Sequence, residues 1–348
     1  MHPLDYKGCI FNALREVECM NIVEQYNLTL QIEVLKEQSA ETLARLCKLV
    51  DKSGNSDCVE ALKVYSHMVN TELYLATSIQ ELDILKSDMV KLENTIKASL
   101  AQASHEVSDV KDVKANSGIP DIESYSSEDF NKALERTIDL LSFNKNVSST
   151  PRAVILGGQS GAGKTTIHRV KMMEYKGDYI VIDGDTYRAQ HPHFRELQEK
   201  YGVDSVDYTK VFAGKMVEAV IDKLSSLKYN LIIEGTLRSA AVPINTATLL
   251  KSKGYTVDFC LIATKPELSY LTTQLRYLEM MIVDPLQARA TPKDHHDGIV
   301  KSLVSNCNEL EQSGLFESIQ VYKRDLEQVY NSKLCTESVG TVVDQILF

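Results

Sequence analysis

The chain has 348 residues, of which 43 % are hydrophobic and 25 % are charged. This composition excludes a wholly disordered chain, and the length is sufficient for two domains. The formal net charge of −10 argues against nucleic acid as a partner, although basic residues in one cleft could still bind an anionic substrate.

The cysteines and the N-terminus indicate a protein that is not exported. The seven cysteines are odd in number and form no C-x-x-C pair, so we expect reduced thiols. The first residues lack the basic and apolar regions of a signal peptide, and no apolar run reaches the roughly 18 residues of a membrane span. We therefore expect a soluble cytoplasmic protein with no membrane or nucleic-acid partner.

Residues 1–104 are predicted to form a helical bundle. No proline lies between Pro3 and Pro120, and Gly54 is the only glycine over nearly the same span. Gly54 lies in a turn-like stretch, and after it apolar residues recur in a heptad pattern. The residues of this pattern are Leu75, Leu82, Leu85, Met89, Leu92 and Ile96.

A polar stretch separates this bundle from the rest of the chain. Residues 105–120 end in Ser-Gly-Ile-Pro and are predicted to be a linker. A helix is expected soon after it, with Ser127 as the N-cap and Glu128 and Asp129 in the first turn. The domain prediction is a bundle over 1–104, a linker over 105–120 and a second domain over 121–348.

From Ala153 the sequence changes to short apolar stretches separated by helical segments. Five stretches rich in β-branched or aromatic residues are predicted as strands: 153–156, 179–183, 230–234, 257–263 and 318–322. Their alternation with helices predicts a parallel sheet with helices on both faces. In such sheets ligands bind beyond the carboxyl ends of the strands.

The sequence GQSGAGKT at 158–165 fits the phosphate-loop pattern G-x-x-x-x-G-K-[ST]. It follows a predicted strand and opens a predicted helix, so backbone N–H groups and the helix N-terminus can hold phosphate oxygens. Lys164 is expected to reach the β- and γ-phosphates, and the Thr165 hydroxyl to bind Mg²⁺. The residues predicted to bind ATP are Gly158, Gln159, Ser160, Gly161, Ala162, Gly163, Lys164, Thr165 and Thr166.

Two features favour ATP over GTP. The base-reading motif [NT]-K-x-D of GTPases is approached only by Thr264–Glu267, which ends in glutamate. The D-x-x-G motif is absent after the third predicted strand. The expected fold is therefore an α/β P-loop kinase-like domain, with a parallel sheet flanked by helices, preceded by an all-α bundle.

Acidic and basic residues near the strand ends are candidates for the acceptor side. Asp183 and Asp185 follow the second predicted strand, where a general base would sit, although loop aspartates are more often turn formers or caps. Glu234 ends the third strand. Arg276 and Arg289 lie where kinases carry lid arginines, with surface ion pairs as the alternative. Four histidines lack metal-ligand spacing and predict no zinc site: His191, His193, His295 and His296.

Together these motifs resemble the zeta toxin family. The likeness lies in GGQSGAGKTT, VIDGDTYRAQHP, DYTKVFAGKMVEAV, NLIIEGTLR, LIATKPELSYLTTQLRYLEM and QARATPKDHHD, and extends from about Ile119 to Phe348. Zeta toxins are the toxin halves of epsilon–zeta toxin–antitoxin systems and act as UDP-N-acetylglucosamine kinases. The resemblance implies ATP-dependent phosphorylation of the 3′-hydroxyl of the N-acetylglucosamine moiety, with a product that blocks peptidoglycan synthesis.

The resemblance also implies roles for individual residues. The family's phosphate-loop lysine corresponds to Lys164, its catalytic aspartate to Asp185, and its two phosphate-clamping arginines to Arg276 and Arg289. All of these residues are present, so the resemblance implies an active enzyme. The implied substrate-binding residues are Asp185, Glu218, Glu234, Thr236 and Arg238.

The resemblance does not cover the residues before 119. In the family the antitoxin is a small helical bundle, usually a separate chain, whose N-terminal helix covers the ATP site of the toxin. The bundle at 1–104 has a suitable length and position, so we hypothesise a built-in antitoxin that acts in cis or in trans. Tyr6 and Phe11 are candidates to fill the nucleotide site, and an oligomerisation or partner-binding bundle is the alternative.

Two other functions fit the same motifs. A kinase for another small hydroxyl substrate, such as an antibiotic or a different nucleotide sugar, would keep the phosphate loop, Asp185 and the lid. A substrate panel separates this candidate. An ATP-gated interaction protein would use the bundle as its output, and Asp185→Asn would leave its function intact.

Overall fold

The computed structural model describes residues 22–53, 55–105, 122–283, 285 and 288–348. The chain divides into two compact units that do not follow chain order. The first unit contains the described residues up to Val34, Lys145–Asp183 and Ile221–Phe348. The second contains Leu35–Asn144 and Gly184–Val220. The predicted linker lies outside the described residues except for His105, so the predicted domain boundaries remain a proposal.

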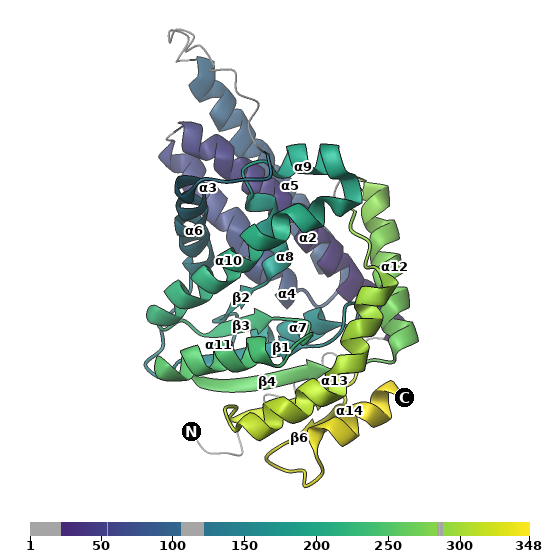
Figure 1. The fold of residues 1–348 in the computed structure, drawn as a ribbon. Coiled ribbons are helices and arrows are strands. Elements are labelled where there is room, and N and C mark those ends of the chain that lie inside the picture. Colours follow the sequence, from purple (N-terminus) through teal and green to yellow (C-terminus); the bar gives the residue numbers. More distant parts are fainter. Residues whose placement is uncertain (1–21, 54, 106–121, 284, 286–287) are drawn as a thin grey trace. The chain divides into compact units, whose positions relative to one another are not determined.

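A six-stranded sheet of order β2-β3-β1-β4-β5-β6 is the framework of the first unit (Figure 1). Its strands are β1 (Arg152–Gly157), β2 (Ile180–Ile182), β3 (Leu231–Glu234), β4 (Thr256–Ile262), β5 (Ser318–Tyr322) and β6 (Gln328–Asn331). β1 to β5 pair in parallel, which confirms the five predicted strands. β6 pairs antiparallel with β5, so the expectation of a wholly parallel sheet is wrong at this edge. Strand β6 has only four residues and a polar residue at each end, so its sequence pattern is too short to predict a strand.

The main helices of the first unit lie between its strands and after the last one. They are α7 (Lys164–Glu174), α11 (Ala241–Ser252), α12 (Pro266–Val283), α13 (Lys293–Ser313) and α14 (Val339–Leu347). The core strands β1 and β4 are buried on both faces, as expected for parallel strands covered by helices. Because β1, β3 and β4 run in the same direction, the segments that follow them meet at one edge of the sheet.

The second unit is helical. Its helices are α3 (Ser56–His67), α4 (Leu73–Leu75), α5 (Ile79–His105), α6 (Ser127–Ser142), α8 (Gly184–Tyr187) and α9 (Phe194–Tyr201), with a π-helical turn at Met68–Glu72. Helices α2 (Ile22–Ser53) and α10 (Ser205–Ser226) contribute residues to both units. The predicted turn near Gly54 agrees with the end of α2 and the start of α3, although Gly54 itself lies outside the described residues.

The predicted heptad seam lies mainly on α5. Leu82, Met89 and Ile96 are buried there, as the pattern predicts. Leu75 lies instead in α4, because Ala76 adopts an extended backbone (ψ 126°) that ends that short helix. The seam therefore begins one helix later than predicted.

Helix α6 begins one residue earlier than predicted. Ser126, and not Ser127, is the N-cap: its Oγ accepts a hydrogen bond from Asp129 N at 3.0 Å, and Asp129 Oδ2 accepts one from Ser126 N at 3.3 Å. This reciprocal pair requires a spacing of three residues, which Ser127 and Asp129 do not have. α6 shares a core with α2, α3 and α5, formed by Leu46, Cys47, Val50, Cys58, Leu62, Ile96 and Leu140.

The five cysteines in the described part of the chain are free thiols. Burial raises the pKa of the Cys47 thiol to about 11 and that of the Cys260 thiol to about 12. Such thiols are inert at neutral pH, as expected for structural cysteines. Over the described ranges, no helix is both long enough and apolar enough to cross a membrane.

Candidate nucleotide and acceptor site

The predicted phosphate loop lies between β1 and α7, at residues 158–163, and α7 begins at Lys164. All three of its glycines have positive φ, a backbone region that favours glycine. The backbone of α12 also packs directly against Gly161. A Cβ at this position would lie 2.1 Å from the carbonyl oxygen of Ser269. The loop lies between a strand and a helix, as the sequence predicts, and its binding of ATP phosphates stays a prediction.

Lys164 is buried and lies beside the acid that ends β3. Its Nζ donates to the carbonyl oxygens of Gly158 at 3.2 Å and Gln159 at 3.4 Å. The same Nζ lies 3.8 Å from Glu234 Oε1, whose other carboxylate oxygen is 3.1 Å from Nε2 of the buried His168. The structure therefore brings together two residues that the sequence predicted separately, Lys164 for the phosphates and Glu234 for the substrate.

Thr165 contacts an acidic residue from helix α2. Its Oγ1 donates a hydrogen bond to Glu33 Oε1 at 2.8 Å, and Thr165 itself is buried. Both residues belong to the first unit. The sequence did not predict Glu33, since the residues proposed to fill the nucleotide site were Tyr6 and Phe11, which lie outside the described residues.

Two further side chains hold the loop from the other strands of the sheet. Thr264, after β4, donates from Oγ1 to the Ala162 carbonyl oxygen at 2.9 Å. Arg324, in the turn between β5 and β6, donates from Nη1 to the Gly161 carbonyl oxygen at 2.8 Å and to Thr272 Oγ1 at 3.0 Å. Sequence patterns gave no signal for Arg324, because its turn precedes a strand that was not predicted.

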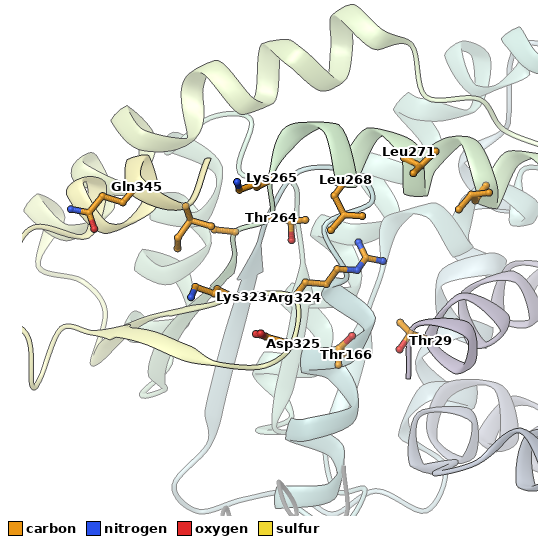
Figure 2. Close-up of a pocket in the computed structure, with 13 residues that line it drawn as sticks. Thr29, Thr166, Thr264, Lys265, Leu268, Leu271, Lys323, Arg324, Asp325 and Gln345 are labelled. Atoms are coloured by element: carbon orange, nitrogen blue, oxygen red, sulfur yellow. The ribbon is translucent and has the colours of Figure 1, made fainter. Parts of the chain in front are cut away.

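A pocket of about 780 Å³ lies next to this loop in the first unit (Figure 2). Leu268, Leu271 and Leu275 of α12 form an apolar wall, and Thr166 lies at its phosphate-loop end. Arg324 extends into the pocket toward α12. An apolar wall next to basic side chains and a phosphate loop suits a nucleotide, with its base on the wall and its phosphates at the loop.

The other predicted residues of the first unit lie after β3, in α12 and between α12 and α13. Thr236 is half-buried and Arg238 exposed in the turn after β3. Leu237 between them is buried with a φ of 54°, a strained conformation, and Asn306 Nδ2 donates to its carbonyl oxygen at 2.8 Å. Helix α13 thus holds the backbone of this turn. The two predicted arginines, Arg276 in α12 and Arg289 between α12 and α13, are half-buried.

The remaining predicted residues, Asp185 and Glu218, belong to the second unit. The side chain of Asp185 is 54 % exposed and accepts a hydrogen bond from Arg188 Nε at 2.9 Å, whereas Asp183 is buried. Of the two aspartates singled out from sequence, only Asp185 therefore has an exposed carboxylate. Glu218 is exposed on α10.

A sequence model of the zeta toxin family, described as "Zeta toxin", matches residues 138–334, which is more than half of the chain. The chain belongs to the zeta toxin family. A second model, "Bacterial epsilon antitoxin", matches residues 24–99. This zeta toxin therefore carries an antitoxin domain in the same chain, and it is a kinase-like toxin.

Named relatives agree with this assignment. The chain is 57 % identical over 228 residues to "Toxin PezT" of Streptococcus pneumoniae serotype 4, covering 66 % of this chain and 90 % of that protein. It is 41 % identical over 211 residues to "Toxin zeta" of Streptococcus pyogenes, covering 61 % and 74 %. A solved structure from the PezAT toxin–antitoxin system of S. pneumoniae has a TM-score of 0.62 at 54 % identity, over 66 % of this chain and 91 % of that chain. These comparisons confirm the expected fold and family.

The antitoxin region of this zeta toxin also contacts the segment that follows Asp185, within the second unit. Lys48 Nζ donates to the carbonyl oxygen of Pro192 at 3.1 Å, and Glu41 forms an ion pair with Arg195. His191 is fully buried in this segment. Its burial, followed by the nearby positive charges of His193 and Lys48, lowers the pKa of His191 to about 4.

Proposed function

We propose that this zeta toxin transfers the γ-phosphoryl group of ATP to the 3′-hydroxyl of the N-acetylglucosamine moiety of UDP-N-acetylglucosamine. The product would block cell-wall synthesis. The observation that carries the proposal is the glycine loop at 158–163 with Lys164 buried beside Glu234, at the edge where parallel strands end. The nucleotide sugar as acceptor follows from the family resemblance.

In the proposed reaction ATP supplies the phosphoryl group, and bound Mg²⁺ would offset the charge of its phosphates. The Thr165 hydroxyl is an oxygen ligand of the kind that Mg²⁺ prefers, so the residues present fit the metal. The acceptor oxygen bonds to the γ-phosphorus, the bond to the ADP oxygen breaks, and Asp185 accepts the hydroxyl proton. Lys164, Arg276 and Arg289 stabilise the charge on the transferring group. The proposed acceptor-binding residues are Asp185, Glu218, Glu234, Thr236 and Arg238.

The pocket in Figure 2 is the proposed site of the adenine and ribose. Its apolar wall at Leu268 and Leu271 can pack on the base, and the Arg324 guanidinium can stack on or neutralise the nucleotide. Thr166 marks the end at which the phosphates would enter the loop. ATP is favoured as donor because the fourth position of Thr264–Glu267 holds glutamate, where the base-reading motif of GTPases requires aspartate.

We also propose that the antitoxin region restrains the kinase, in cis within the chain or in trans in an oligomer. The hydrogen bond from Thr165 to Glu33 supports the cis arrangement, because it joins the two regions within one chain. The carboxylate takes the hydroxyl that Mg²⁺ would need and adds negative charge beside the phosphate site. Thr29, one helical turn earlier, lines the nucleotide pocket. A helix in this position would have to leave before the Mg²⁺ complex of ATP could bind.

ATP consumption with UDP-N-acetylglucosamine tests the proposal, measured for the full chain and for its Glu33→Ala variant. Turnover that requires the nucleotide sugar, and that rises in the variant, supports both parts. Equal turnover in the two chains would support the proposed kinase activity but contradict the proposed restraint by the antitoxin region. Turnover only with another acceptor from a panel of nucleotide sugars and aminoglycosides would replace the proposed substrate.

A further inference from the structure

A buried chain of polar side chains joins the phosphate loop to helix α13. Ser269 at the start of α12 and His296 at the start of α13 are both fully buried, and Ser269 Oγ lies 2.8 Å from His296 Nε2. On the loop side, Gln159 Nε2 donates to Ser269 Oγ at 3.3 Å. On the α13 side, His296 Nδ1 lies 3.1 Å from Asp297 Oδ1.

Serine, histidine and aspartate in this order are also the groups of a nucleophilic triad. Here burial excludes that chemistry, because neither Ser269 nor His296 has exposed surface through which a substrate carbonyl could reach Oγ. Ser269 Oγ also donates to the Pro266 carbonyl oxygen at 3.0 Å. These hydrogen-bonded side chains therefore have either a purely structural role or a role in positioning the site. Their location beside the phosphate loop favours the positioning role.

The hydrogen bonds of this chain are satisfied for either charge state of the histidine. A serine hydroxyl donates once and accepts up to twice. If Ser269 donates to Pro266, it accepts from Gln159 and from Nε2–H of a protonated His296. If it donates to Nε2 of a neutral His296, Nδ1–H still donates to Asp297. In both arrangements the connection from Gln159 to Asp297 is unbroken.

Asp297 is a fixed, charged end of the chain. Lys293 Nζ donates to its Oδ2 at 2.6 Å, and the bonds from Lys293 and His296 lower the pKa of the Asp297 carboxyl. A carboxylate accepts hydrogen bonds only, so Nδ1 of His296 must be its donor. The imidazole ring is thereby held in one orientation at the start of α13.

Of the two helices joined by these hydrogen bonds, α12 contains one predicted arginine, and the segment just before α13 contains the other. Arg276 follows Ser269 on α12 by about two helical turns. Arg289 lies in the segment just before α13, whose N-cap is Pro292, and His296 N donates to the Pro292 carbonyl oxygen at 3.1 Å. The hydrogen bonds that link Ser269 and His296 to Gln159 therefore hold the starts of α12 and α13 in place relative to the phosphate loop, and with them the two segments that carry the arginines.

We propose that Gln159, Ser269, His296 and Asp297 form a positioning element that holds the arginine-bearing segments of α12 and α13 in register with the phosphate loop. This inference rests on the proposed kinase function. Misplacement of a charge-stabilising group by about 1 Å can reduce turnover by about 10²-fold. The loop keeps its separate ties to Thr264 and Arg324, so loss of the positioning element should impair turnover and spare ATP binding.

The kinetic test uses the full chain with Glu33→Ala, which relieves the proposed restraint. His296→Asn and Ser269→Ala are each expected to lower kcat by about 10- to 100-fold, with the KM for ATP changed by less than about threefold. The double variant should be no worse than either single one, because the residues act as a unit. His296→Gln, which can still donate to Ser269, should recover part of the loss. His295→Asn is the matched control, since His295 is exposed and adjacent.

A second measurement does not depend on activity. Amide hydrogen exchange of the full chain is expected to accelerate at residues 158–163 and 288–291 in His296→Asn, and not in His295→Asn. Ser269→Ala carries the same test if His296→Asn fails to fold. Unchanged exchange, additive kcat losses, or a KM rise that accounts for the whole loss would each overturn the inference. If the Glu33→Ala chain phosphorylates no acceptor, the proposed function fails, while the exchange result still decides the positioning role.

Discussion

The Glu33 carboxylate and the Thr165 hydroxyl are 2.8 Å apart within a single chain. One residue belongs to the region matched by the epsilon antitoxin model and the other to the phosphate loop of the zeta toxin region. The threonine hydroxyl at this position of a phosphate loop is a Mg²⁺ ligand. Antitoxin helix and metal would therefore compete for one oxygen atom, which gives the proposed restraint a defined chemical basis.

Replacing Glu33 by alanine is expected to raise the affinity for the Mg²⁺ complex of ATP. A hydrogen bond to a charged group contributes about 1.5–3 kcal/mol, so its loss corresponds to about 10- to 100-fold in affinity. Calorimetric titration of the full chain and the variant measures this change. Glu24→Ala is the control, because Glu24 is exposed on the same helix. Equal affinities in all three chains would contradict the restraint.

Asp185→Asn, made in the Glu33→Ala chain, is expected to lower kcat by roughly 10²- to 10⁴-fold while the KM for ATP stays the same. The amide cannot accept the proton of the acceptor hydroxyl, yet it keeps the size of the side chain and a hydrogen-bond acceptor for Arg188. Asp207→Asn is the control, since Asp207 is an exposed carboxylate of α10 with its own lysine partner. Full turnover in Asp185→Asn would show that Asp185 is not the general base of the reaction.

Gly161→Ala is expected to abolish ATP binding. The new Cβ would lie 2.1 Å from the Ser269 carbonyl oxygen, at a φ of 75° that alanine rarely adopts. The matched change Gly214→Ala meets open space within helix α10 and should stabilise the fold by about 0.5–1 kcal/mol. Fluorescence titration with a nucleotide analogue and thermal unfolding of both variants measure the two effects. A Gly161→Ala chain that binds normally would show that the loop can shift without loss.

Sequence reasoning succeeded where the signal is local. The phosphate loop was predictable because its glycines, Lys164 and Thr165 are consecutive and lie between a strand and a helix pattern. The α6 start was predicted one residue late because two adjacent serines, Ser126 and Ser127, satisfy the N-cap preference, and only the reciprocal bonds of Asp129 distinguish them.

Long-range contacts could not be predicted in the same way. Glu33 is one of four glutamates on α2, and nothing in its sequence neighbourhood indicates that it reaches Thr165. Arg324 precedes a strand too short to predict, and its bond to the Gly161 carbonyl depends on the order of the strands in the sheet. The link between Ser269 and His296 likewise requires two helices to pack, which a periodic pattern does not specify.

Acid is expected to destabilise the second unit through His191. In the folded chain its pKa is about 4, below the roughly 6.5 of an unfolded histidine, so the unfolded chain binds more protons between these values. The contribution of neutral His191 to stability is complete above about pH 6.5 and is lost as the pH falls toward 4. Between pH 7.5 and pH 5 the expected loss is about 1–2 kcal/mol.

His191→Phe should reduce this pH dependence, because a phenyl ring takes no proton and can pack against Tyr125 and Phe212, which now contact the imidazole. The nearby charges of His193, Lys48, Glu196 and Asp129 remain in the variant, so their titration cancels in the comparison. Urea unfolding at pH 7.5 and pH 5 measures the difference between the two chains. His295→Asn, at an exposed histidine, should keep the full pH dependence of the parent chain. If His191→Phe keeps it as well, the acid sensitivity arises from other groups, and the buried imidazole is not its source.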